Sequence, residues 1–523
     1  MRRADPSMTR VTSVSGDALG SRLARVRAWH GAGSPLRRGS ERGERLLPLV
    51  LVVSWMVVLV AALFKLSEGH LYPVVAAMSF YACVLLWVAV AARGPVVLLG
   101  ASVALYWIPV PGLFQGEVLS LLIIASPIVP LTLAWWLLTR TQAGPKSSPA
   151  LDIALGLFVL SGFAELVMHG VSSFSSTRFF IAVLVPAVAL FCCSRRVVGS
   201  DTAWRVVCVF LWSTTALCVL FVLGSVFGLA GMSETSGRFG GSFMVPMLGT
   251  IQFGEATLAS NLAVACPLGF LAALSGIRSV RLAGVAFLVA VGLSIALTQG
   301  RGGMIGALVS SIVLLLLLVR DRNPRAGRAV AAGVVMVSAF VALAIVLTGW
   351  YAPRSAVYAE RYTGMIDSVV NGKLVAGVDN GRFKNWEYHA RGLSQHPEGV
   401  GWVTTYDVYR PGQIPYPHNV FLLFGSALGL PGMTAYVLIL GVTGAVFLRG
   451  RRGASRDRRA TGAAGLASLA ALVVTGVSAT TGVYDAYGAG VVWLTIGLEM
   501  LMLRSVTHAD GGGRVSEGWR PHA

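Results

Sequence analysis

The sequence predicts an all-α polytopic membrane protein, with about 12–14 transmembrane helices and one large outward loop that contains short helices. Of the 523 residues, 55% are hydrophobic and only 12% are charged, and the mean hydropathy is +0.72. This composition is too apolar for a soluble globular protein. Long runs with almost no charge recur along the chain. A helix satisfies all of its backbone hydrogen bonds inside a ~30 Å hydrocarbon layer, so each run predicts a spanning helix.

The candidate spans set the domain organisation. A basic tail at 1–46 precedes N-terminal membrane helices at 47–230; a second membrane region at 231–503 contains the outward loop 351–417, and a tail at 504–523 follows. The first tail is rich in Arg, Gly and Ser without helical periodicity, which predicts a disordered segment. The spans lie at 47–64, 71–92, 95–110, 118–139, 151–167, 179–193, 206–230, 256–275, 282–298, 303–319, 329–350, 431–448, 462–481 and 487–503.

The basic residues predict which side each connection faces. Ten arginines precede residue 46, and placing this tail in the cytoplasm puts 31 of the 42 Lys and Arg residues on the same side. Cytoplasmic loops of membrane proteins carry such an excess. The net charge of +19 is therefore explained by topology, and its spread over many separate segments excludes a nucleic-acid partner. We expect a multi-pass protein of the cytoplasmic (inner) membrane with both termini inside.

The sequence predicts neither a metal site nor a cofactor. The six cysteines form no CxxC pair, and His389, His396 and His418 lack the spacing of a local metal motif such as HExxH. No phosphate-binding P-loop and no GxSxG nucleophile motif occurs, so ATP-driven transport and serine hydrolysis lack their usual signals.

Two outward connections between spans each carry a single arginine. Arg238 lies in the glycine-rich link "SETSGRFGGSFMVPMLGTIQFGE" at 233–255, and Arg301 lies in the short turn "LTQGRGGMIGA" at 297–307. A charge close to hydrocarbon costs up to roughly 2–3 kcal/mol unless it is paired, and the planar guanidinium matches a phosphate group. Arg301 is therefore a candidate anion ligand, whereas Arg238 taken alone is equally explained as a solvated loop residue.

The outward loop 351–417 contains a predicted helix from about Arg382 to Leu393. Arg382, Trp386, His389 and Leu393 then share one face of this helix. Such a face suits a sugar phosphate, since the aromatic ring can stack on a sugar and the guanidinium can bind the phosphate. A helix that lies on the bilayer surface would show the same pattern.

The loop ends in "PYPHNVFLLFGSALGLPG" at 415–432. Pro417 disfavours helix at the preceding residue, so we expect the next helix to begin at His418 and Asn419, with Asn419 as its cap. His418 would then lie beside free backbone N–H groups, which favour anions. Taken alone, this pattern favours an ordinary helix cap with a solvated histidine.

Four segments in order, "TQGRGG", "GRFKNW", "HPEGVGW" and "PHNVFLLFGSALGLPG", resemble the O-antigen ligase and O-antigen polymerase family over residues 230–448. The resemblance implies a membrane glycosyltransferase that takes glycan from an undecaprenyl-diphosphate carrier at the outer face of the cytoplasmic membrane. It implies His418 as the catalytic residue near the acceptor hydroxyl. It also implies a donor diphosphate held by Arg301 and Arg382, with Arg238 assisting. From the helix face and the cap described above, Trp386, His389 and Asn419 are the candidate sugar-binding or supporting residues. Gly300 departs from the family, which often has Ser there.

Several alternatives stay open at this stage. Ligase and polymerase share the donor and differ in the acceptor, which is a glycan, a lipid or a protein. A transporter of polysaccharide or lipid-linked glycan is the main rival, although no internal repeat of the kind common in transporters is visible. An assembly subunit that uses the loop for docking is the third reading. Membrane lipids are partners in every case.

Overall fold

A computed structural model of the chain describes residues 142–143 and 148–511 apart from gaps in the second range. The longest gaps are 335–381 and 407–416. Shorter gaps lie at 171–174, 176–177, 198, 228–231, 236–237, 246–248, 254, 299, 322–326, 328–329, 331–332, 479–480 and 484–485. The four predicted spans before residue 140 and nearly all of the predicted span 329–350 therefore fall outside the described residues, as does the N-terminal tail.

Six described helices are long and apolar enough to cross a membrane, which confirms the predicted helical, multi-pass fold class. They are α7 (Pro149–His169), α12 (Arg278–Thr298), α13 (Arg301–Arg320), α19 (Val420–Arg451), α20 (Arg456–Ser478) and α21 (Ala486–Gly511). The bundle also contains the π-helix η2 (Phe180–Leu184), α9 (Val185–Arg195), α10 (Ser200–Phe227) and α11 (Glu255–Ala273). Helix α21 continues past the predicted domain end at residue 503.

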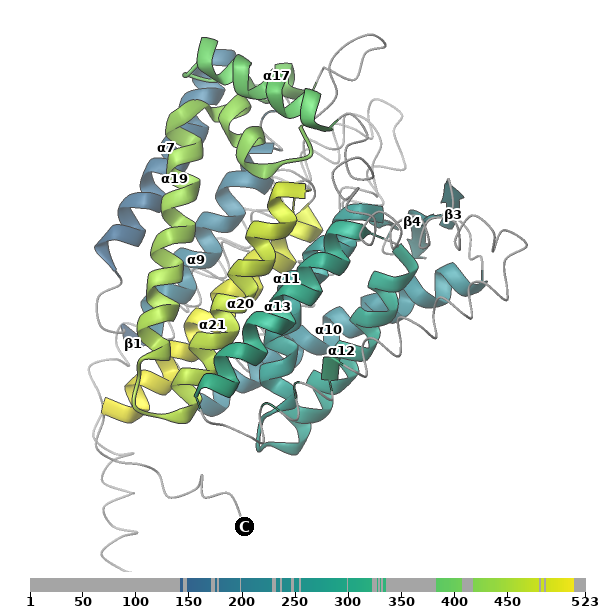
Figure 1. Ribbon diagram of the computed structural model, residues 1–523, viewed down its shortest axis with the longest axis vertical. Helices are drawn as coiled ribbons and strands as arrows, with labels where there is room; N and C mark the ends of the chain where they lie inside the picture. The colour runs from purple at the N-terminus through teal and green to yellow at the C-terminus, as the bar shows by residue number, and fades with distance from the viewer. Residues whose placement is uncertain are drawn as a thin grey trace, which may run out of the picture. The chain divides into compact units, whose positions relative to one another are not determined.

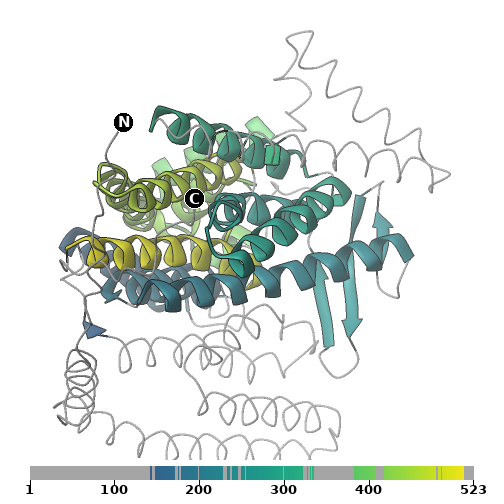
Figure 2. The ribbon, with the colours of Figure 1, turned by 90° about the horizontal axis from the view of Figure 1, so that it is seen from below.

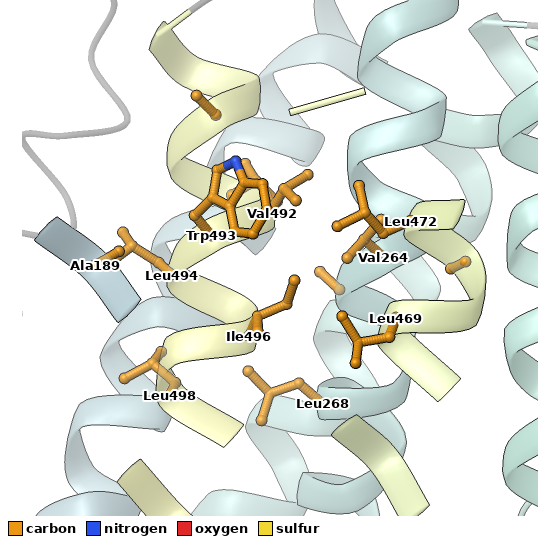
Figure 3. Packing of buried hydrophobic residues seen from close by; sticks show 14 of the residues in the cluster. Ala189, Val264, Leu268, Leu469, Leu472, Val492, Trp493, Leu494, Ile496 and Leu498 are labelled. Carbon is orange, nitrogen blue, oxygen red and sulfur yellow. The ribbon is translucent and has the colours of Figure 1, made fainter. Parts of the chain in front are cut away.

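Helix α11 lies at the centre of the described bundle, where it contacts α12, α13, α20 and α21. Leu268 of α11, Leu469 of α20 and Ile496 of α21 pack against one another in this core (Figure 3). Small residues bring the helix backbones together, as is usual inside a membrane. A Cβ atom on Gly303 of α13 would lie 2.4 Å from the Ala259 backbone of α11. The N-terminal turn of α13, which carries Arg301, is therefore seated directly on α11.

The C-terminal helices interleave with the earlier ones. Helix α21, yellow in Figure 2, lies beside the blue helices α9 and α10 and contacts both. At one end of the bundle, Arg195 pairs with Asp152 at 2.9 Å, and Arg451 pairs with Asp321 at 3.4 Å. These pairs join α9 to α7 and α19 to the residue that ends α13. The basic ends of several helices are thus gathered on one face.

The glycine-rich link between α10 and α11 is more regular than the sequence indicates. Its strands β3 (Met232–Thr235), β4 (Arg238–Val245) and β5 (Gly249–Phe253) form an antiparallel sheet in that order. A further short pair joins β1 (Gln142–Ala143) to β2 (Arg196–Val197). Cross-strand pairing satisfies backbone groups of a link that is too rich in glycine to form a helix. These small sheets are additions to an otherwise helical fold.

Two helices lie at the end of the bundle opposite the ion pairs. They are α17 (Arg382–Gln395) and α18 (Gly401–Tyr406). Figure 1 shows α17 across the ends of α7 and α19, and contacts link α17 to α19 and α18 to both α7 and α19. Helix α17 agrees with the predicted helix and extends it by two residues. The described part of the outward loop is therefore attached to two membrane helices.

Candidate functional site

The turn before α19 holds His418 in a constrained conformation. Its backbone φ is +46°, and among the described residues it is the only non-glycine residue with positive φ. This left-handed region costs a side-chain-bearing residue on the order of 1 kcal/mol and persists only where the surroundings impose it. Asn419 is the helix cap, as predicted, because its Oδ1 accepts hydrogen bonds from Phe421 N at 2.9 Å and Leu422 N at 3.1 Å.

Helix α17 contacts the residue that precedes His418 in this turn. Trp386 Nε1 donates a hydrogen bond to the carbonyl oxygen of Pro417 at 2.8 Å. His389 is 4% exposed, and its Nδ1 lies 2.9 Å from Ser426 Oγ on α19. Leu393 points at Gly425, where an added Cβ would lie 2.8 Å from the leucine side chain. The predicted face of α17 thus packs on α19, and Trp386 and His389 support the turn; their contact with a sugar stays a prediction.

The segment after α17 is hydrogen-bonded into a kink of α19. At Gly429 the helix has φ +71° and ψ −174°, and Pro431 follows. The N–H of Leu430 donates to Pro397 O at 2.8 Å, and Ser426 O accepts from Val400 N at 2.7 Å. In a regular helix, Leu430 N–H would itself donate to Ser426 O. Pro397 O and Val400 N–H from the loop therefore replace the partners that Leu430 N–H and Ser426 O would have in a regular helix. Both backbone groups of α19 stay hydrogen-bonded despite the kink.

An exposed pair borders the same segment. His396 Nδ1 lies 3.2 Å from Glu398 Oε1, and both side chains are more than half exposed. The pKa of Glu398 is lowered because its own backbone N–H and then His396 bond to the carboxylate. Screening by water at such an exposed site makes its contribution to folding small.

The three candidate arginines each begin an element. Arg238 is the first residue of β4, Arg301 of α13 and Arg382 of α17. Strand β4 contacts α11 and α12, and α13 contacts α11, whereas α17 contacts α19. The structure thus brings Trp386, His389, His418 and Asn419 together. The convergence of the arginines on His418 stays a prediction.

No group of three or more His, Cys, Asp or Glu residues that could hold a metal ion occurs among the described residues.

Residues 285–437 match the family model described as O-antigen ligase. Over these residues the chain is similar to the O-antigen ligase family. The matched O-antigen ligase region begins inside α12 and ends inside α19, so it contains α17, α18 and the His418 turn. No curated protein matches the chain.

Sequence reasoning missed three contributors to the O-antigen ligase region and its support. Ser426 meets both α17 and the segment at Val400, and Gly429 forms the kink. Glu165 of α7 accepts a hydrogen bond from Trp402 N at 3.0 Å. Glu165 did carry a signal, because an acidic residue inside an apolar span is costly and marks a candidate functional position.

We predict that Gly429→Ala disrupts the kink in the O-antigen ligase region. An added Cβ would lie 2.4 Å from Pro397 O and Glu398 C, and the backbone at φ +71° and ψ −174° is almost confined to glycine. We expect a loss of about 3 kcal/mol or more in stability, measured by thermal unfolding in detergent. Gly441→Ala is the matched control on α19, because nothing lies within 4 Å of its added Cβ. Equal melting temperatures for the two variants would contradict the role of the kink.

Proposed function

We propose that this protein is a membrane glycosyltransferase that transfers or polymerises glycan from an undecaprenyl-diphosphate-linked donor onto an acceptor hydroxyl. The O-antigen ligase match carries the proposal, because it spans the segment in which a strained histidine turn is fastened to two helices. Strain of this kind gathers at functional sites, where the surrounding structure maintains it. The family match supports a lipid-linked donor and an acceptor in the membrane; the identity of both belongs to the proposal.

The proposed reaction is a single displacement with inversion. The acceptor oxygen forms a bond to the anomeric carbon while the bond from that carbon to the diphosphate oxygen breaks. The hydroxyl proton passes to the His418 imidazole, acting as general base, and the electron pair of the broken bond leaves with the diphosphate. The diphosphate is already a good leaving group, so the remaining demand is stabilisation of its charge.

Arg301, Arg382 and Arg238 are the proposed ligands of that charge. Arg301 and Arg382 stand at the first positions of α13 and α17, where unbonded backbone N–H groups and the helix dipole also favour anions. A guanidinium adds a planar pair of donors that fits phosphate oxygens. Arg238, at the start of β4, would assist from the glycine-rich sheet.

We further propose that the end of the bundle bearing α17 faces away from the cytoplasm. The opposite end carries Arg195, Arg320 and the basic segment that runs from Arg449 to Arg459. An excess of arginine marks cytoplasmic ends of membrane helices. The reaction would then take place at the outer face of the cytoplasmic membrane, with both termini inside.

His418→Ala and Arg382→Ala should each abolish transfer while leaving the protein in the membrane. The first removes the proton acceptor, and the second removes a ligand of the leaving diphosphate. The measurement is product formation from lipid-linked glycan by purified protein in detergent, with membrane abundance determined in parallel. His396→Ala and Arg391→Ala are matched controls, because both side chains are exposed and lie outside the proposed machinery. Full activity in either test variant would refute these assignments, and a transporter would form no product at all.

Transfer should be insensitive to metal removal. The proposed reaction stabilises the leaving diphosphate with guanidinium groups, so a chelator has no catalytic ion to withdraw. We expect the initial rate in excess EDTA to equal the rate in buffer with added Mg²⁺. A rate that falls with EDTA and returns with Mg²⁺ would show that a bound cation shares the work assigned to the arginines.

A further inference from the structure

Glu165 is a buried carboxyl group near the outer end of a membrane helix. It lies four residues before the last residue of α7 and is 1% exposed. Its Oε1 accepts a hydrogen bond from the backbone N–H of Trp402, 237 positions later in the chain, at 3.0 Å. Trp402 is the second residue of α18. Because the first N–H groups of a helix have no acceptor within it, this amide depends on an acceptor from outside.

The second oxygen of the same carboxyl group argues against a purely stabilising role. Glu165 Oε2 is buried and has no hydrogen-bond partner among the described residues. A buried polar atom left unpaired opposes folding by about 1–3 kcal/mol. An apolar side chain at this position would remove that penalty but also the acceptor that the Trp402 amide uses. The two kinds of side chain therefore differ little in stability, and what the glutamate adds is the bond that fixes Trp402.

The contacts beyond Trp402 lead to the His418 turn. The Trp402 side chain is fully buried and meets the Phe424 ring of α19 edge to face, with centroids 6.2 Å apart. Two residues before Trp402, Val400 N donates to Ser426 O on α19. The outer end of α7 also lies against this segment, since a Cβ on Gly401 would be 2.8 Å from the His169 ring. The segment is thus held between α7 and the part of α19 that Asn419 caps.

We propose that Glu165 is a positioning residue that fixes the active-site loop to the membrane bundle and so sets the geometry of His418. The proposal rests on the proposed function, because it assigns to Glu165 a part in the same reaction. Glu165 acts through Trp402, Val400 and the first half of α19. Its contribution is the hydrogen bond that its carboxyl oxygen accepts.

Two substitutions separate the hydrogen bond from the shape of the side chain. Glu165→Gln keeps an oxygen that can accept from Trp402 N–H, whereas Glu165→Leu keeps a similar volume without an acceptor. If Glu165 positions the loop, the leucine variant should lose about 10–100-fold in kcat, which is the effect expected for a displacement of roughly 1 Å at the reacting groups. The glutamine variant should stay within a few-fold of the unaltered protein. Asp152→Asn is the matched control, because it changes a carboxyl group at the other end of α7.

Amide hydrogen exchange tests the contact without relying on activity. In full-length protein in lipid nanodiscs, the exchange of the Trp402 amide should accelerate at least tenfold in Glu165→Leu, and it should be unchanged in Asp152→Asn. Exchange in Glu165→Gln should remain close to that of the unaltered protein. Transfer of lipid-linked glycan is then measured on the same preparations.

The outcomes distinguish a failure of the positioning role of Glu165 from a failure of the proposed glycosyltransferase function. Faster exchange together with lower kcat in Glu165→Leu alone supports the proposal. If Glu165→Leu shows faster exchange of the Trp402 amide but an unchanged kcat, the positioning role is overturned. It is also overturned if exchange of this amide does not change in Glu165→Leu. Either result leaves the proposed function intact. Equal loss of activity in Glu165→Gln and Glu165→Leu overturns the positioning role as well, since the carboxyl group itself would then be required. If unaltered protein forms no product, the proposed function fails first.

Discussion

The pair of backbone hydrogen bonds between the loop and α19 at the Gly429 kink is the contact on which the arrangement around His418 depends. Ser426 O accepts from Val400, and Leu430 N–H donates to Pro397 O, so the loop replaces the partners that a continuous helix would have used. Each such bond contributes about 1 kcal/mol net. Their larger effect is geometric, because two backbones joined at two points cannot slide past each other. Gly399 and Gly429, both with positive φ, allow that approach.

Ser426 links this junction to the histidine turn. Its carbonyl group binds the loop, while its hydroxyl group meets His389 of α17, which also holds Pro417 through Trp386. The nine-residue stretch from Val420 to Leu428 is therefore fastened at both ends. A catalytic group gains most when its supports fix it close to the productive geometry. The left-handed backbone of His418 is the conformational result of these supports.

Local patterns predicted those parts of the site that local chemistry determines. The length of α17, the shared face of Trp386 and His389 and the cap at Asn419 follow from helix periodicity and capping preference within a few residues. The kink of α19 was not predicted. A helix starts at Val420 after the predicted cap Asn419, and the part of α19 after Gly429 covers the predicted span 431–448. The partners of Ser426 and Glu165 are remote in the chain, so no local periodicity encodes them. The sheet in the glycine-rich link was missed for a related reason, because strand pairing is a property of two segments.

Two buried glutamates make hydrogen bonds in interfaces of very different extent, one between helices of the bundle and one between the bundle and the loop. Glu499 of α21 meets Ser468 of α20 at 2.8 Å in the fully buried core, so its contact joins two helices that already pack along their length. Glu165 contacts α18, which has only six residues and touches α7 far less extensively than α19 does. Loss of one hydrogen bond between long, packed helices leaves the rest of the interface to keep their alignment. Loss of the bond from Glu165 removes the hydrogen bond that joins α7 to α18, and among the described contacts the segment beside the His418 turn is then held mainly by α19.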